Sequence, residues 1–213
     1  MKLGLLGGTF NPVHLAHLRI AEEARDAAGL EQVLFIPAPD PPHKPLAGNI
    51  DFELRTEMVK LAISDNPAFM LCDIEARRSG KSYTVDTLPA LKHERPDDEL
   101  HFIIGSDSYL ELGLWHNYAE LFPLTSFIVI ERPGREITEP LQQLPEAVRH
   151  SFVSETPKLL RHSSGTTILF IQGTHLDISS SHLRELIAEG LSIRYLVPPV
   201  VEAYIAQKGL YQS

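Results

Sequence analysis

Short apolar runs alternate with amphipathic stretches along this chain, and no other feature constrains its fold as strongly. Runs such as Val33–Ile36 and Phe127–Glu131 are apolar at nearly every position rather than at every second one. Strands that are apolar on both faces are typical of a parallel sheet covered by helices on both sides. The sequence therefore predicts an α/β fold built on a doubly wound parallel sheet.

The individual elements follow from hydrophobic periodicity, helix caps and glycine stops. Strands are expected at Lys2–Leu6, Val33–Ile36, Met70–Ile74, Leu100–Ile104, Phe127–Glu131 and Thr167–Gln172. Helices are expected at Leu15–Gly29, Asp51–Asp65, Thr84–His93, Ser180–Gly190 and Pro198–Gly209, with shorter ones at Ser106–Leu112, Tyr118–Phe122 and Pro145–Ser151. The stretch Arg132–Gly165 is expected to be mostly irregular. The apolar face expected on the helix over Asp51–Asp65 consists of Leu54, Met58, Leu61 and Ala62.

Length, charge and cysteine content restrict the class of protein. A chain of 213 residues is expected to form a single domain over residues 1–213. Its 19 basic and 28 acidic residues give a net charge of −9, which argues against nucleic acid or an anionic membrane as a partner. The single cysteine, Cys72, and the lack of a signal peptide or apolar span predict a cytoplasmic protein. The oligomeric state is left open, including a homo-oligomer.

The stretch "GGTFNPVHLAHL", residues 7–18, directly follows the first predicted strand. In doubly wound sheets, ligands bind beyond the carboxyl ends of the strands. Gly7 and Gly8 allow the backbone to approach a phosphate closely, while His14 and His17 share one face at a helix start that favours anions. We therefore expect a polyphosphate site here. The alternative is a glycine turn that carries two incidental histidines.

Three other sites for nucleotides or metals are poorly supported. The dinucleotide pattern G-x-G-x-x-G is absent, because the glycines near the N-terminus have the wrong spacing. "RRSGKS" resembles the end of a phosphate-binding loop, but Glu75 stands where the first glycine belongs. A zinc site at His14 and His17 would need a third ligand, and neither histidine has an acidic neighbour.

Two motifs resemble a known superfamily. The stretch over residues 7–17 resembles the G-x-F-D-P-x-H-x-G-H signature of nucleotidyltransferases, and "ISSSHLR" (Ile178–Arg184) resembles their I-S-S-T-x-I-R motif. More narrowly, the chain resembles the bacterial nicotinate-nucleotide adenylyltransferases. This likeness extends to "PPHK" (Pro41–Lys44), "SYTVDTL" (Ser82–Leu88), "GSD" (Gly105–Asp107), Trp115, "RPG" (Arg132–Gly134) and the stretch Tyr195–Tyr211. Asn11, Ala16 and the pair Ser181-His182 depart from the usual residues.

The resemblance implies a Rossmann-like nucleotidyltransferase fold with a small C-terminal helical part. It also implies transfer of the adenylyl group of ATP to nicotinate mononucleotide, with Mg²⁺ accompanying ATP and no dedicated metal site on the protein. The implied catalytic residues are His14, His17, Lys44 and Arg184. The implied ATP-binding residues are Gly7, Gly8, Thr9, Phe10, Gly105, Asp107, Ile178, Ser179 and Ser180. The implied mononucleotide-binding residues are Tyr83, Thr84, Trp115 and Arg132.

Some of these residues also have a purely structural interpretation. Ser179 and Asp107 would each serve as the N-cap of a helix, Lys44 as a solvated loop residue and Trp115 as a partly buried core aromatic. Two functions remain as alternatives. One is a related adenylyltransferase that acts on nicotinamide mononucleotide or phosphopantetheine, and the other is a non-catalytic nucleotide-binding relative.

Overall fold

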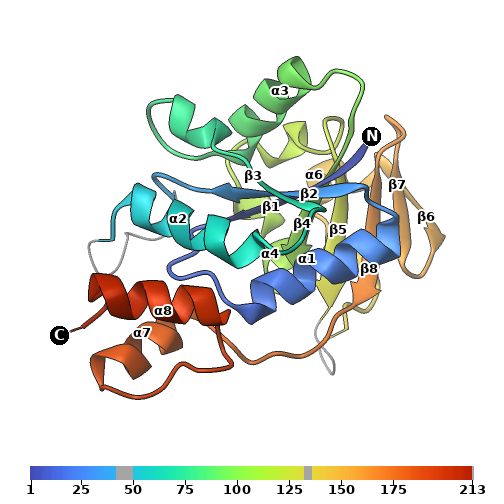
Figure 1. Ribbon diagram of the computed structural model, residues 1–213. Coiled ribbons are helices and arrows are strands. Elements are labelled where there is room, and N and C mark those ends of the chain that lie inside the picture. Colours follow the sequence, from blue (N-terminus) through green and yellow to red (C-terminus); the bar gives the residue numbers. More distant parts are fainter. Residues whose placement is uncertain (42–49, 132–135, 213) are drawn as a thin grey trace. The chain divides into compact units, whose positions relative to one another are not determined.

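The computed structural model describes residues 1–41, 50–131 and 136–212 (Figure 1). Its strands are β1 (Lys2–Gly8), β2 (Gln32–Pro37), β3 (Phe69–Leu71), β4 (Glu99–Gly105), β5 (Ser126–Glu131), β6 (Phe152–Thr156), β7 (Leu159–His162) and β8 (Thr167–Gln172). Its α-helices are α1 (Leu15–Ala28), α2 (Phe52–Ile63), α3 (Thr84–Glu94), α4 (Ser106–Leu110), α5 (Pro140–Gln143), α6 (Glu146–Arg149), α7 (Ser180–Ala188) and α8 (Pro199–Lys208). Short 3₁₀ turns are η2 (Ile74–Arg77), η3 (Leu112–Leu114) and η4 (Tyr118–Glu120).

Within the described residues, eight strands form one sheet in the order β3-β2-β1-β4-β5-β8-β7-β6. The central pairs β1–β4, β4–β5 and β5–β8 are parallel. Strand β7 runs antiparallel to β8, and β6 runs antiparallel to β7. The mostly parallel sheet confirms the predicted α/β class, and the helices between its strands are those that parallel crossovers require.

A glycine lets the neighbours of β1 approach it closely. Leu3 and Leu5 have no exposed surface. A Cβ atom at Gly4, between them, would lie 2.8 Å from Leu30 Cδ1 and 3.1 Å from Ile103 Cδ1. Side chains from the loop before β2 and from β4 therefore fill the space beside this position, which fits a strand buried on both faces.

The chain divides into two compact units. Unit 1 comprises residues 1–6, 21–33 and 83–175, and unit 2 comprises residues 7–20, 34–82 and 176–213. The small C-terminal helical part belongs to unit 2, where Figure 1 shows α7 and α8 near each other at the C-terminal end of the colour scale. That residues 1–213 form a single domain stays a prediction. In the described ranges, no helix is long and apolar enough to cross a membrane.

Two segments differ from the sequence expectations. The strand expected over Met70–Ile74 ends at Leu71, and Ile74 instead begins the 3₁₀ turn η2. The stretch Arg132–Gly165 contains α5 and the antiparallel hairpin β6–β7 in addition to the helix expected there. The hairpin gave no apolar signal because only Phe152 of β6 is buried. The remaining elements are confirmed, with ends shifted by one or two residues.

The buried face of α2 is also rotated from the one expected. Leu54 and Leu61 are only half-buried. The residues that are fully buried are Arg55, Met58, Val59, Ala62 and Ile63. Arg55, rather than the neighbouring Leu54, therefore points into the interior on this helix.

Candidate active site

The turn that follows β1 lies in unit 2 and is built around Phe10. This residue has a left-handed backbone (φ 49°), is 2% exposed, and sets its ring edge-on to His17 at a centroid distance of 5.1 Å. A Cβ atom on Gly8 would come within 3.0 to 3.3 Å of the Phe10 ring. Gly8 therefore makes room for this ring, a role that the sequence did not indicate.

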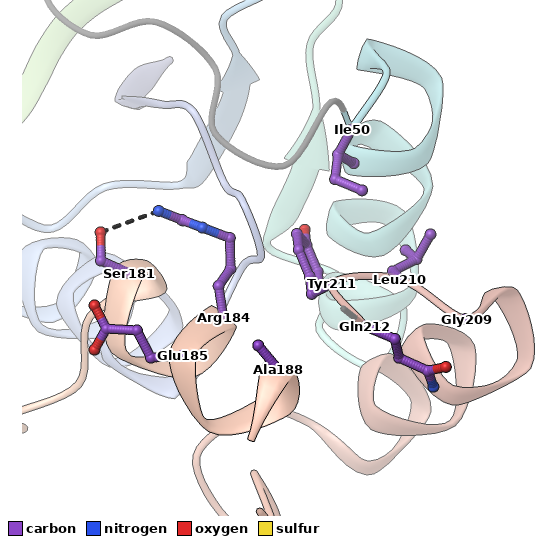
Figure 2. A pocket seen from close by; sticks show the side chains of 9 residues that line it. All are labelled: Ile50, Ser181, Arg184, Glu185, Ala188, Gly209, Leu210, Tyr211 and Gln212. Atoms are coloured by element: carbon purple, nitrogen blue, oxygen red, sulfur yellow. Dashed lines mark hydrogen bonds between the residues drawn. The ribbon is translucent and has the colours of Figure 1, made fainter. Parts of the chain in front are cut away.

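Helix α7 donates hydrogen bonds to two carbonyl groups of the same turn. Arg184 Nη1 donates to the Asn11 carbonyl oxygen at 2.7 Å, and Ser180 Oγ donates to the Pro12 carbonyl oxygen at 2.8 Å. Arg184 Nη2 also donates to Ser181 Oγ at 3.1 Å, the bond drawn in Figure 2. The two motifs that the sequence placed far apart are therefore in direct contact.

Ser179 is the N-cap of α7, as its structural interpretation required. Its Oγ accepts a hydrogen bond from the His182 N–H at 3.2 Å. Ile178 precedes it as a half-buried residue in the loop. Because the Ser180 hydroxyl already donates to Pro12, the donors that Ser180 can offer an anion are backbone N–H groups at the helix start.

His14 and His17 stack face to face, with ring centroids 3.7 Å apart and 27° between the planes. The His14 backbone N–H donates to His17 Nδ1 at 3.2 Å, which places the proton of a neutral His17 on Nε2. Burial lowers the pKa of His14 to about 4. Burial, together with the neighbouring His14, lowers the pKa of His17 well below its ordinary value. At neutral pH both imidazoles are therefore uncharged, and each can donate one N–H.

Arg55 of α2 also binds this turn, and sequence reasoning missed it. Its Nη1 donates to the Thr9 carbonyl oxygen at 2.6 Å and its Nη2 donates to the Pro39 carbonyl oxygen at 3.5 Å. The side chain has no exposed surface, and burial lowers its pKa. The signal in the sequence is its spacing, since it precedes the buried residues Met58 and Val59 by three and four positions.

Tyr211 is a second residue that sequence reasoning gave no role. Its hydroxyl donates to Asn11 Oδ1 at 2.7 Å, and burial raises its pKa, so it stays protonated. Figure 2 shows it on the wall of an open pocket of about 470 Å³. The pocket is lined by Ile50, Ser181, Arg184, Glu185, Ala188, Gly209, Leu210, Tyr211 and Gln212. Asn11 stands where the resembling family usually has aspartate. Its side-chain oxygen accepts this hydrogen bond from within the protein.

In unit 1, Tyr83 and Thr84 lie at the start of α3. Tyr83 is the N-cap residue, with an extended backbone and no capping bond from its side chain. Its ring contacts that of His116, with the centroids 4.4 Å apart and the planes tilted by 31°. The first N–H groups of a helix have no partner within that helix, so this end of α3 offers donors for a carboxylate. His116 was not predicted, and its contact with Tyr83 depends on the tertiary fold.

Trp115 is half-buried and is held by one edge against the core of unit 1. Its ring is perpendicular to that of Phe102, with centroids 6.0 Å apart. It also borders a pocket of about 480 Å³ that is lined by Gly113, Trp115, His116, Asn117, Tyr118, Ala119 and Glu120. Trp115 thus packs partly against the core and also borders a pocket large enough for a ligand.

Gly105 and Asp107 lie at the junction of β4 and α4, also in unit 1. Both are exposed, and Gly105 is the N-cap position of α4 with φ −80°. No heavy atom lies within 4 Å of a Cβ atom built on Gly105, so neither sterics nor backbone conformation requires glycine there. Asp107 is not the N-cap that its structural interpretation assumed, because it lies in the first turn of the helix.

Lys44 and Arg132 lie outside the described residues. In the described part of the chain, no group of three or more histidine, cysteine, aspartate or glutamate residues could hold a metal ion. The structure thus brings His14, His17, Ser180 and Arg184 together in unit 2, while Tyr83, Thr84, Trp115, Gly105 and Asp107 belong to unit 1.

Comparisons with known proteins match most or all of the chain. The cytidylyltransferase-like family model matches residues 5–186. A protein of Trichlorobacter lovleyi named "Probable nicotinate-nucleotide adenylyltransferase" is 73% identical, with 100% of both chains covered. One of the same name from Pelobacter propionicus is 55% identical, covering 100% of this chain and 99% of the relative.

Solved structures show the same fold at low sequence identity. The Plasmodium falciparum nicotinic acid mononucleotide adenylyltransferase complexed with NaAD superposes with a TM-score of 0.76 at 22% identity, covering 99% of this chain and 97% of that one. A Vibrio parahaemolyticus structure described as a nicotinate-nucleotide adenylyltransferase gives a TM-score of 0.66 at 17% identity, covering 100% and 96%. The expected Rossmann-like nucleotidyltransferase fold is therefore confirmed.

Proposed function

The chain belongs to the cytidylyltransferase-like family and, within it, to the nicotinate-nucleotide adenylyltransferases, and on this premise we propose its reaction. The enzyme transfers the adenylyl group of ATP to nicotinate mononucleotide, giving nicotinate adenine dinucleotide and pyrophosphate. The observation that carries the proposal is the uncharged histidine pair on a turn whose carbonyl groups are bound by Arg184 and Ser180. We infer that N–H groups of this turn are donors to the polyphosphate.

The chemistry needs positioning and charge stabilisation more than a general base. The 5′-phosphate of the mononucleotide is already anionic, and one of its oxygens forms a bond to the α-phosphorus of ATP. The bond between that phosphorus and the oxygen bridging to the β-phosphate breaks, and pyrophosphate leaves with the electron pair. We assign the imidazole N–H groups of His14 and His17 to the phosphate oxygens, and Arg184 and Lys44 to the charge of the leaving group. Mg²⁺ enters as part of the ATP substrate.

The start of α3 supports a preference for the acid over the amide. The first N–H groups after Tyr83 are donors, which suit a carboxylate that only accepts hydrogen bonds. The amide of nicotinamide mononucleotide would direct its NH₂ group at those donors and leave them unpaired, which costs on the order of several kcal/mol. Trp115 would stack on either pyridine ring, and we assign Arg132 to the mononucleotide as the resemblance implies.

A substrate panel tests this function. With ATP and Mg²⁺, we expect kcat/KM for nicotinate mononucleotide to exceed that for nicotinamide mononucleotide by at least roughly a hundredfold. Pyrophosphate release gives the rates, and mass spectrometry identifies the dinucleotide. Trp115→Ala should weaken both mononucleotides alike. Equal efficiency on the two would instead support the amide-using or less selective alternative, and binding of ATP without turnover would support a non-catalytic relative.

We place this activity in the cytoplasm, where ATP and the mononucleotide are available. A net charge of −9 at neutral pH makes nucleic acid an unfavourable partner. Arg184 and Arg55, which both bind the turn at residues 9–12, supply the positive charge that an anionic small molecule needs on an acidic protein, and we assign Lys44 to the same role.

A further inference from the structure

Among the arginines in the described residues, Arg55 alone is fully buried. It has no exposed surface, and within the described residues its hydrogen bonds go only to two carbonyl oxygens, of Thr9 and Pro39. Its Nε has no partner in the described structure, and its guanidinium lies 5.6 Å from the centre of the Phe52 ring. Exposed arginines such as Arg161 instead pair with a carboxylate.

A buried guanidinium that forms no ion pair with a carboxylate of the described residues is unfavourable for stability alone. Burial lowers the pKa of Arg55, and the charge of Glu53 on the same helix offsets this only in part. Removing a charge from water is costly, and well-packed apolar side chains often replace buried ionic groups with no loss of stability. The neighbours of Arg55 on the same face of α2, Met58 and Val59, are apolar and fully buried. A methionine at position 55 would also pack among these apolar residues. Packing therefore does not explain why the residue is charged, and we look for the reason in the function.

The hydrogen bond from Arg55 to the Thr9 carbonyl oxygen provides a functional explanation for the charge. The Thr9 carbonyl and the Phe10 N–H belong to a single peptide unit, and a charged donor on the carbonyl polarises that unit and strengthens its N–H as a donor. Phe10 is also held in the left-handed region (φ 49°), which a non-glycine residue rarely adopts without support. The 2.6 Å bond from Arg55 to Thr9 fixes the peptide unit that leads into this conformation.

We propose that Arg55 is a positioning residue for adenylyl transfer, which fixes and polarises the Thr9–Phe10 peptide of the turn that receives the polyphosphate. The proposal rests on the proposed function, since it is the anionic phosphate that benefits from the buried charge. Arg55 acts through the backbone of the turn and does not touch the nucleotide, because its own side chain is closed off from solvent.

Two substitutions separate the charge from the packing. Arg55→Met removes the donors and the charge but keeps an unbranched apolar chain. Arg55→Lys keeps the charge but loses the guanidinium fork. Met58→Ala is the matched control, because Met58 is fully buried on the same face of α2, one turn further along. It destabilises the helix without removing a bond to the turn.

Steady-state kinetics and thermal unfolding then test the proposal. We expect Arg55→Met to lower kcat at least thirtyfold with less than a threefold change in KM for nicotinate mononucleotide, and Arg55→Lys to keep at least ten times the kcat of Arg55→Met. Met58→Ala should lower the melting temperature while leaving kcat of the folded enzyme within threefold.

If Arg55→Met keeps kcat within threefold, or if Met58→Ala loses as much kcat as Arg55→Met, the proposal is wrong. If Arg55→Met does not fold, Arg55→Gln decides, because it also removes the charge but keeps a polar side chain. A fall in kcat of at least fivefold then supports the proposal, and a smaller fall contradicts it.

Binding of ATP alone keeps this test independent of the reaction. We expect the dissociation constant for ATP, measured by isothermal titration calorimetry, to rise at least fivefold in Arg55→Met and to stay unchanged in Met58→Ala. An unmodified protein that binds ATP but forms no dinucleotide would contradict the proposed function and leave this result valid. Equal ATP affinity in all three proteins would contradict the role of Arg55 even if the reaction is as proposed.

Discussion

The ring centroids of His14 and His17 lie 3.7 Å apart. At this distance two positively charged imidazoles would repel each other. Their lowered pKa values follow from burial at the turn, so the structure makes this pair a hydrogen-bond donor rather than a cation. Sequence reasoning could predict the pair, because its spacing and the glycines before it are local features. It could not predict the charge state, which depends on burial in the folded chain.

Replacing His17 should affect the rate far more than the fold. In His17→Asn the amide oxygen can still accept the bond from the His14 N–H, but the imidazole donor is lost. Loss of one such donor to a developing charge lowers kcat by on the order of 10²–10³. Steady-state rates and a thermal melt of the same preparation provide the measurement. A folded variant within tenfold of normal kcat would exclude this role.

The same burial makes the stability of the fold sensitive to acid. The pKa of His14 is about 4 in the folded protein and about 6.5 when unfolded, so the unfolded state binds more protons between these values. Stability should therefore fall as the pH is lowered from 6.5 towards 4, with His14 contributing on the order of 3 kcal/mol.

Urea unfolding at several pH values measures this slope. His14→Asn should reduce it, while the exposed control His93→Asn should not. Part of the slope should remain in His14→Asn, because burial also lowers the pKa of His17, His101 and His162. An unchanged slope in His14→Asn would show that this histidine is not protonated on unfolding in that range.

At the scale of elements, sequence reasoning succeeded where one residue pattern decides the structure. The central strands β1, β4 and β5 were predicted because their consecutive buried residues are almost all apolar. The hairpin β6–β7 was missed because an edge strand with one buried residue has no such pattern. Arg55 was missed for the opposite reason, since a charged residue on a buried helix face is recognised only once its carbonyl partners are in place.

At the junction of β4 and α4, a substitution of Gly105 should change ATP binding without changing the stability of the fold. Gly105→Ala should leave the melting temperature unchanged, because the new methyl group meets no atom within 4 Å and φ −80° suits any residue. If ATP approaches this backbone as the resemblance implies, KM for ATP should rise at least tenfold. Gly8→Ala is the contrasting variant and should lower the melting temperature, since its methyl group would lie 3.0 Å from the Phe10 ring. Unchanged kinetics in Gly105→Ala would remove Gly105 from the ATP site.

At the scale of the whole molecule, the turn at residues 9–12 is fixed by side chains that come from distant parts of the sequence. Arg55 is 46 positions from its partner Thr9, Ser180 is 168 positions from Pro12, and Tyr211 is 200 positions from Asn11. Local patterns predict the turn itself, and the sequence motifs identify Ser180. The contribution of Tyr211 follows only from the folded chain, since one hydroxyl among six tyrosines has no distinguishing local signal.

Removing the Tyr211 hydroxyl tests this distant contact. Tyr211→Phe should lower the free energy of unfolding by about 1 kcal/mol, because it removes the hydrogen bond that the Tyr211 hydroxyl donates to Asn11 Oδ1. It should also lower kcat several-fold, because Asn11 belongs to the turn that carries the histidines. Tyr204→Phe on α8 is the control, since the Tyr204 ring lies 5.8 Å from Lys208 Nζ. Urea unfolding and initial rates give the comparison, and equal effects of the two substitutions would contradict a role for this bond.

The separation between Asn11 and Tyr211 also has a consequence for the order of events during synthesis. The ribosome must add 200 residues after Asn11, up to and including Tyr211, before the hydrogen bond can form, which takes roughly 10–40 s at bacterial and eukaryotic elongation rates. During that interval the nascent chain carries its histidines without Tyr211, and for most of it without Ser180 and Arg184. Catalytic competence is therefore a late event of translation, and a chain released early would hold the first motif in a turn that lacks these anchors.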